Sequence, residues 1–227
     1  MRARLEAGFR HRLRELLTAL PSAERQVEAE RLIASARERA ARDHLSPARA
    51  LLLVHEAARA QSGAPPAIAA GAEAPRFLCD PSLGGLARWL RAAGYDARLY
   101  ADVPVHRLPD EALRRGCVLL TTDAETLERR LVADGSLRVL WLPSAFTTTE
   151  KLRLVLRDLG LSLREPRCMA CGGELVAQPK DAVRPRIPPR TALWKDEFFV
   201  CVSCDRLFWQ GTHWERIVPA LRAAAAA

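Results

Sequence analysis

The chain has 227 residues and a formal net charge of +8, from 35 basic and 27 acidic residues. Apolar runs such as Leu51–Val54 are far shorter than the roughly 20 residues needed to cross a bilayer, and the charged N-terminal segment lacks the apolar core of a secretory signal. We therefore expect a cytoplasmic protein without a membrane span. The basic excess is mostly Arg and is spread along the chain, which fits either a polyanion-binding protein or simply an Arg-rich composition.

Residues 1–62 are expected to form a helical accessory region. Apolar residues recur at helical spacing over the first turns of this region, and Ser46 followed by Pro47 suits the start of a later helix. Segment 63–75 is rich in Ala, Gly and Pro, which is the composition of a linker. Nothing in residues 1–75 indicates chemistry, so we expect these helices to self-associate or to bind a protein partner.

Residues 76–165 alternate short apolar segments with amphipathic ones, separated by short polar turns. This alternation predicts an α/β domain with a parallel sheet wrapped by helices on both faces. The expected strands are 77–79, 97–101, 117–120 and 137–142, and the expected helices are 83–93, 109–115, 124–133 and 148–159.

Four aspartates lie at strand ends or helix starts of this predicted sheet. Asp80 and Asp123 come directly after strands, Asp102 follows another strand, and Asp110 begins a helix. Ligands of such sheets bind outside the carboxyl ends of the strands, so these carboxylates are candidates for convergence at one edge. Converged carboxylates need a cation, and oxygen ligands suit Mg²⁺ or Mn²⁺, which can support phosphodiester cleavage. The alternative is that these residues only cap the helices that follow them.

Four cysteines predict a metal site within residues 166–218. Cys168 and Cys171 form one Cys-x-x-Cys pair, and 29 residues separate it from a second pair, Cys201 and Cys204. Two such turns place four thiolates at the corners of a tetrahedron, as in structural zinc sites. We expect a zinc ribbon with a closing helix, with a redox dithiol as the alternative. The two remaining cysteines are expected to be buried apolar residues: Cys79 and Cys117.

Basic residues in two regions are candidates for RNA contacts. Arg88 and Arg91 lie three residues apart in the helix after Asp80, where they could grip phosphates or simply face solvent. The segment between the cysteine pairs is rich in proline and basic residues and contains Trp194, with Phe198 close by. It suits either contacts to phosphates and bases or a plain surface loop. The candidate RNA-binding residues of this segment are Lys180, Arg184 and Arg186.

Several of these motifs together resemble one domain family. The stretch Asp80–Asp96, the segment Leu119–Asp123, the cysteine pairs and Phe208–Trp214 resemble the family named for the C-terminal region of the Mut-seven exonuclease. The resemblance spans residues 76–218 and implies a PIN-like ribonuclease domain with an inserted zinc ribbon, an RNA substrate, and acids around Mg²⁺ or Mn²⁺. By position it implies that Asp80, Asp110 and Asp123 are among those acids. The chain departs from the family at Thr122, where a basic residue is usual.

These observations predict an RNA-acting protein, namely a metal-dependent endoribonuclease with a structural zinc ribbon. Two alternatives stay open at this point. The same fold could bind RNA without cleaving it, or it could be a zinc-stapled scaffold that binds protein through residues 1–62. The candidate catalytic residues are Asp80, Asp102, Asp110 and Asp123.

Overall fold

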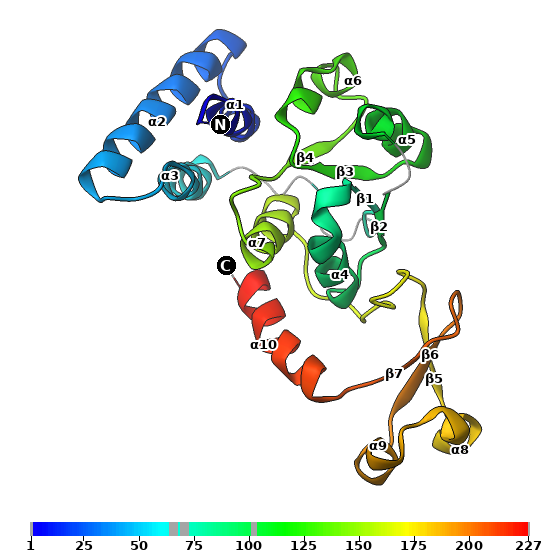
Figure 1. Cartoon of the computed structure of the whole chain (residues 1–227). Coiled ribbons are helices and arrows are strands. Elements are labelled where there is room, and N and C mark those ends of the chain that lie inside the picture. The colour runs from blue at the N-terminus through cyan, green and yellow to red at the C-terminus, as the bar shows by residue number, and fades with distance from the viewer. Residues whose placement is uncertain (1, 64–67, 69–72, 101–103, 227) are drawn as a thin grey trace.

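The computed structural model describes residues 2–63, 68, 73–100 and 104–226. It contains a four-stranded parallel sheet and a three-stranded antiparallel sheet. Figure 1 shows the N-terminal helices on one side of the parallel sheet and the antiparallel sheet on the other. The prediction of an α/β fold is confirmed, and a C-terminal cysteine cluster compatible with a zinc ribbon accompanies it.

The parallel sheet has the strand order β2-β1-β3-β4. Every residue of β1, β3 and β4 is buried, because helices cover both faces of the sheet. Figure 1 shows α4 and α7 on one face and α5 and α6 on the other. The strands are β1 (Phe77–Cys79), β2 (Ala97–Leu99), β3 (Val118–Thr121) and β4 (Val139–Trp141), and the helices are α4 (Gly84–Ala92), α5 (Leu108–Arg115), α6 (Arg130–Ala133) and α7 (Thr148–Leu159).

The boundaries of several elements differ from the predicted ones. The helix expected over 124–133 is two pieces, the 3₁₀ helix η3 (Ala124–Glu128) and α6, because Arg129 between them is extended, with φ −69° and ψ 141°. The second and fourth strands are shorter than predicted, and residue 101 of the expected second strand lies outside the described residues. Two further 3₁₀ helices are η1 (Pro81–Leu83) and η2 (Val105–Arg107).

The N-terminal helices share one hydrophobic core with the parallel sheet. They are α1 (Arg2–Leu16), α2 (Ser22–Arg42) and α3 (Pro47–Ser62). Phe9 of α1 packs edge-on against Trp141 of β4, with ring centroids 5.8 Å apart, and against Phe146 at 6.2 Å. A Cβ atom at Gly8 would lie 2.4 Å from the Trp141 ring, so only glycine permits this close approach. Of the predicted linker, residues 64–67 and 69–72 lie outside the described part of the chain.

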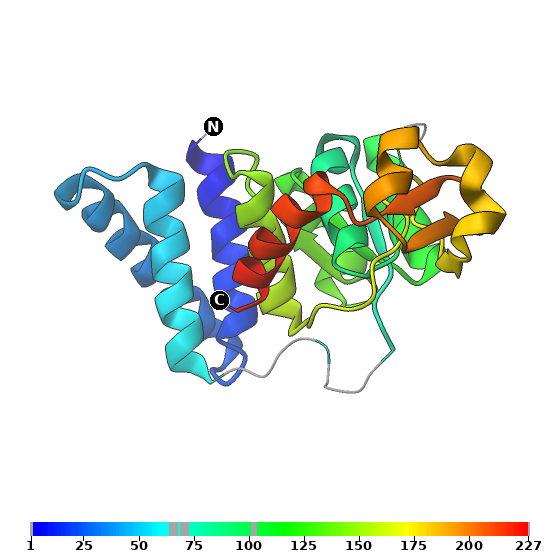
Figure 2. The ribbon, with the colours of Figure 1, turned by 90° about the horizontal axis from the view of Figure 1, so that it is seen from below.

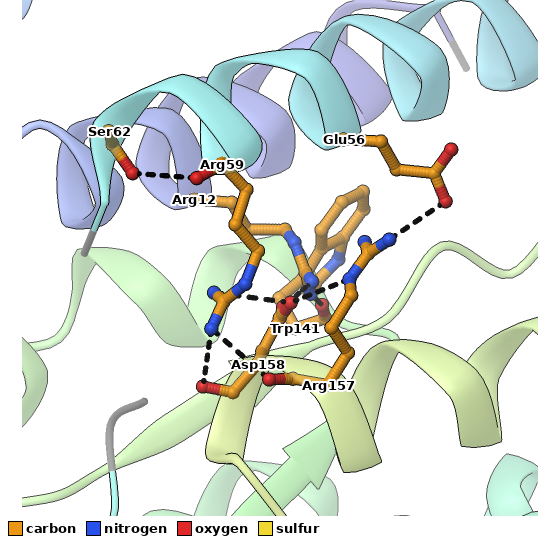
Figure 3. A network of polar contacts seen from close by, with 7 residues as sticks. All are labelled: Arg12, Glu56, Arg59, Ser62, Trp141, Arg157 and Asp158. Carbon is orange, nitrogen blue, oxygen red and sulfur yellow. Dashed lines mark hydrogen bonds and ion pairs between the residues drawn. The ribbon is translucent and has the colours of Figure 1, made fainter. Parts of the chain in front are cut away.

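A buried polar network joins these helices to α7 (Figure 3). Arg12, whose exposed fraction is 2%, donates hydrogen bonds to the backbone oxygen of Trp141 at 2.7 Å and to the Asp158 carboxylate. Arg59 of α3 forms an ion pair with the same carboxylate at 3.5 Å, and Arg157 pairs with Glu56 at 3.0 Å. Buried charges of this kind need their partners, so the network fixes the N-terminal helices against the sheet domain.

His55 lies beside this network and gives folding a pH dependence. Its side chain is 1% exposed, and its pKa is held well below 6.5 by burial and then by Arg12, Arg157 and Arg59. Below pH 6.5 His55 binds a proton in the unfolded chain but not in the folded chain. The free energy of unfolding should therefore fall by up to about 1.4 kcal/mol for each unit by which the pH is lowered.

We expect His55→Phe, which keeps an aromatic ring against Phe9, to remove this part of the pH dependence. Denaturant unfolding of both proteins at pH 7.5, 6.5 and 5.5 measures the difference. If the free energy of unfolding changes with pH in the same way in both proteins, His55 is not the source of the pH dependence.

The C-terminal part contains the antiparallel sheet, with the order β5-β6-β7, and a helical insert between β5 and β6. A small core of Val183, Ile187 and Phe198 supports the insert. The final helix, α10, packs against α7 and ends at Ala225, beyond the predicted limit of residue 218. The elements are β5 (Leu175–Gln178), α8 (Lys180–Val183), η4 (Arg184–Arg186), α9 (Pro189–Trp194), β6 (Phe198–Cys201), β7 (Leu207–Trp209) and α10 (Thr212–Ala225).

None of the described helices is long and apolar enough to cross a membrane.

Candidate functional site

Asp80 and Asp123 follow two neighbouring strands, β1 and β3, at the carboxyl edge of the parallel sheet. The chain leaves β1 toward β2 on one side and returns to β3 on the other, so the strand order reverses between β1 and β3. Ligands of doubly wound sheets bind at such a reversal point, outside the carboxyl ends of the strands. The fold therefore brings two of the predicted acids to the position where a ligand is expected.

The Asp80 carboxylate is buried and accepts five hydrogen bonds. Oδ1 accepts from the backbone N–H of Ser82 at 2.9 Å and from its hydroxyl at 2.6 Å. Oδ2 accepts from the Thr121 hydroxyl at 3.0 Å, and from the backbone N–H and the hydroxyl of Thr122 at 2.6 and 3.2 Å. These donors hold the carboxylate in one orientation at the strand end.

One hydroxyl links the two aspartates. Thr121 Oγ1 donates to Asp80 Oδ2 and accepts from the backbone N–H of Asp123 at 3.0 Å. The Asp123 carboxylate, which is half-buried, accepts from the Glu125 backbone N–H at 3.1 Å and from the Thr126 hydroxyl at 3.0 Å. Asp123 thus caps η3, as the capping alternative expected, while its carboxylate stays partly open to solvent.

Only one of the other two predicted acids lies in the described part of the chain. Asp110 is exposed in the first turn of α5, and Asp102 lies outside the described residues. Among the described His, Cys, Asp and Glu side chains, the four cysteines are the only group of three or more that could hold a metal ion. The neighbouring acid Glu111 accepts hydrogen bonds from Arg114, Arg115 and Tyr100, which lower its pKa to about 2.

A lysine that the sequence did not single out lies near this edge. Lys151 is in the first turn of α7, and this turn touches the start of α4, because a Cβ atom at Gly85 would lie 3.1 Å from the Thr148 hydroxyl. Burial lowers the pKa of Lys151, and the nearby charges of Asp80 and Glu150 partly offset that effect. Its position beside Asp80 depends on the packing of α4 against α7, which no local motif records.

The four cysteines predicted as metal ligands do come together. All four Sγ atoms lie within 4.8 Å of one another, with 3.6 Å between Cys168 and Cys204 and 3.4 Å between Cys171 and Cys201. A tetrahedral ion with sulfur ligands at 2.3 Å separates the sulfur atoms by about 3.8 Å, so the cluster has the size of such a site. The other cysteines stay apart from it: Cys79 is buried and Cys117 is half-buried.

The surroundings of the cluster shift the pKa values of two of its thiols in opposite directions. Burial raises the pKa of Cys171 to about 12. Burial also acts on Cys201, but hydrogen bonds from the backbone N–H groups of Cys204 and Ser203, and then from the Cys171 and Cys204 thiols, lower its pKa to about 7. Four thiolates at the spacing of this cluster would repel one another, so a bound cation would be needed to hold all four in the deprotonated form.

Arg91 has a structural role that differs from the predicted RNA contact. Its side chain is buried, and Nε donates to the backbone oxygen of Ala97 at 2.7 Å. Nη1 donates to the backbone oxygens of Met169 and Ala170 at 3.0 and 2.9 Å, within the first Cys-x-x-Cys turn. All these acceptors are protein atoms, so Arg91 fixes the cysteine turn against α4, whereas Arg88 is exposed to solvent.

The three predicted RNA-binding residues of the insert are paired with acids. Lys180 contacts Asp196 at 2.8 Å, and Arg184 contacts Asp181 at 3.5 Å. Arg186 contacts the Asp205 carboxylate at 3.2 Å and donates to its backbone oxygen. Each charge is thus partly balanced within the protein, although Arg184 and its partner are both exposed.

A cleft of about 1320 Å³ separates the cysteine-bearing sheet from the parallel sheet. It is lined by aromatic residues such as Trp209 and Trp214, and by Arg76 and Asp96, which stand at the amino ends of β1 and β2. Its lining holds three arginines against four acids, so its charge does not favour a polyanion. The carboxyl edge of the sheet, with Asp80 and Asp123, remains the better candidate for phosphate chemistry.

Fold and site together define a class of α/β domain that carries strand-end carboxylates and a four-cysteine cluster of the size of a metal site. Residues 75–221 match the family described as the Mut7-C RNAse domain, and the chain belongs to this family. Over 113 residues it is 30% identical to the human (Homo sapiens) protein named Exonuclease mut-7 homolog. The match covers 48% of this chain and 13% of the human protein, so the chain corresponds to a small part of that relative. No solved structure gives a significant match. The family and the relative support a nuclease-like role.

Proposed function

We infer that the chain is a divalent-metal-dependent ribonuclease whose ion is held by Asp80 and Asp123, with a zinc ion in the four-cysteine site. The observation that carries this proposal is the placement of both aspartates at the strand-order reversal, on neighbouring strands and linked through the Thr121 hydroxyl. Mg²⁺ is commonly held by one or two carboxylates together with substrate phosphate, which two aspartates satisfy. When bound, such an ion supplies charge neutralisation and activation of water for phosphodiester hydrolysis.

The residues of the chain have separate parts in this proposal. Asp80 and Asp123 supply the ligand oxygens, and the Ser82, Thr121 and Thr122 donors hold the Asp80 carboxylate in place. Lys151 adds a positive charge that can attract the RNA backbone to this edge. Participation of Asp110 and Asp102 stays a prediction from the family resemblance.

Zinc suits the second centre because four thiolates fill a tetrahedral coordination sphere and leave no open position for a substrate. The zinc is therefore proposed as structural. None of the six cysteines forms a disulfide in this structure, which fits a reducing compartment and the proposed cytoplasmic location.

Cleavage of a labelled single-stranded RNA with Mg²⁺ or Mn²⁺ tests the enzymatic proposal. Asp80→Asn and Asp123→Asn should each lower the cleavage rate about 100-fold or more, because each removes a carboxylate that would hold the divalent ion. Asp43→Asn changes an exposed aspartate at the end of α2 and is the matched control. Circular dichroism checks that each variant is folded, since Asp80 accepts five hydrogen bonds. Unchanged cleavage in both site variants would rule out the proposed site.

A second candidate is an RNA-binding module that does not cleave. It is favoured by the hydrogen bonding of Asp80, whose two oxygens are already satisfied by five protein donors. In that case the chain would bind RNA with an affinity that falls steeply with salt, and no condition with Mg²⁺ or Mn²⁺ would give cleavage. A scaffold that binds only protein partners would neither bind RNA nor cleave it.

A further inference from the structure

The insert between β5 and β6 presents a large aromatic side chain to solvent. Trp194 at the end of α9 is 82% exposed and its neighbour Leu193 is 75% exposed, the two highest values among the large apolar side chains that the structure describes. Tryptophan is usually mostly buried, and its exposure leaves a large apolar face in water. By contrast Phe198, the other aromatic residue predicted for base contacts, is 1% exposed and belongs to the core of the insert.

An arginine accompanies Trp194 on the same face of α9. Arg190 precedes Trp194 by four residues, a spacing that places two side chains side by side on a helix. Arg190 is exposed, and no acid or hydrogen-bond partner of its side chain is found among the described residues. The other basic residues of the insert are paired with acids, including Lys195 with Glu215 at 3.4 Å. The free positive charge of the insert therefore lies beside its exposed aromatic ring.

The face of α9 that carries Arg190 and Trp194 is supported by packed side chains and ion pairs. Val183 and Ile187 of the insert pack with Phe198 of β6. The Lys180–Asp196 pair joins the two ends of the insert, and the Arg186–Asp205 pair ties it to the turn after β6. A ring that is already positioned loses little conformational entropy when a ligand stacks on it. The exposure of Trp194 is thus a property of a supported helix end.

The insert lies on the same side of the molecule as the candidate acids. Arg4 near the start of α1 pairs with Glu125 at 3.0 Å, two residues after Asp123, so the beginning of α1 marks the acid edge. In Figure 2 that end of α1 and the orange helix α9 both lie at the upper side of the view. Figure 1 shows α4, which carries the exposed Arg88, between the parallel sheet and the insert. This side of the molecule therefore carries both the candidate acids and the insert.

We propose that α9 binds an unpaired base of single-stranded RNA, with the base stacked on Trp194 and an adjacent phosphate contacted by Arg190. Every base has a face that can stack on an aromatic ring, so the contact selects unpaired RNA without selecting its sequence. The inference rests on the proposed function, because it assigns a substrate class to the same protein. It predicts that RNA bound at the acid edge is single-stranded where it passes the insert.

Binding of the full chain to a fluorescent 12-nucleotide single-stranded RNA, measured without Mg²⁺ or Mn²⁺, tests this proposal. Trp194→Ala should weaken binding about tenfold, and Trp194→Phe should recover most of the loss because a ring remains. Arg190→Gln should weaken binding and reduce the slope of log affinity against log salt by about 0.7, the value for one phosphate on a single strand. Duplex RNA of the same length should bind the Trp194→Ala variant and the unaltered chain equally.

Leu193→Ala is the matched control, since it removes an equally exposed apolar side chain next to Trp194. It should change RNA affinity less than twofold. Equal single-strand affinities for Trp194→Ala and the unaltered chain would overturn the proposal while leaving the ribonuclease proposal standing. An equal loss in the Leu193 and Trp194 variants would also overturn it, because it would indicate a general apolar contact such as a protein partner makes. If the unaltered chain binds no RNA at low salt, the proposed function fails as well.

Discussion

Replacement of Cys201 by Ser is expected to release the metal and to unfold the antiparallel sheet, while the parallel sheet stays folded. The antiparallel part has little apolar core of its own, chiefly Val183, Ile187 and Phe198. Structural zinc sites contribute about 10–16 kcal/mol of binding free energy, which in small domains is folding free energy. The loss of one ligand therefore removes more stabilisation than this part can replace.

The measurement combines metal content by mass spectrometry with limited proteolysis. The unaltered chain should carry one zinc ion and resist cleavage between β5 and β7, whereas Cys201→Ser should carry none and be cut there. Cys117→Ser is the control, because Cys117 is a half-buried thiol outside the cluster. A Cys201→Ser protein with a full complement of zinc would contradict the assignment of this ligand.

Replacement of Arg12 by Ala should destabilise the whole chain by about 3–5 kcal/mol. The change removes a buried cation, opens a space between α1 and α7, and leaves the Trp141 backbone oxygen and the Asp158 carboxylate without their shared partner. For a chain of this length each kcal/mol shifts the melting temperature by roughly 2–4 °C, so a decrease of about 10 °C is expected.

Thermal and denaturant unfolding measure this effect. Arg14→Ala is the matched control, because Arg14 is exposed on the same helix and its side chain donates to Gln26 at 3.2 Å. The control should change the unfolding free energy by less than about 0.5 kcal/mol. The double variant Arg12→Leu with Asp158→Leu should be more stable than the sum of the single effects predicts, since no buried charge is left unpaired. Equal midpoints for Arg12→Ala and Arg14→Ala would show that the network does not hold the helices in place.

Much of the fold was predictable because its signals are local. Short apolar segments that end in polar residues, such as Phe77–Cys79 before Asp80, define buried parallel strands without any knowledge of their neighbours. The cysteine pairs were equally informative, since each turn places its two thiols by itself. The break at Arg129 was not predicted, because amphipathic spacing continues through it and only the extended backbone conformation interrupts the helix.

Residue roles set by distant partners could not be predicted from the sequence. Arg88 and Arg91 look alike on one helix, but the carbonyl groups that bind Arg91 belong to Met169 and Ala170, far along the chain. Trp194 and Phe198 are both aromatic residues in a basic segment, and only the packing of the insert shows that the first is exposed and the second buried. Lys151 was missed for the same reason, because its relation to Asp80 arises from helix packing.

The close approach of Gly8 to Trp141 bears on where this folded unit begins. The residues that match the family start at 75. A fragment that begins there would lack α1, and the side chains of Trp141 and Phe146 that α1 covers would be exposed to water. It would also leave the Asp158 carboxylate without its ion pairs to Arg12 and Arg59. A fusion protein that uses this nuclease-like domain should therefore include α1, α2 and α3, because they complete its hydrophobic core.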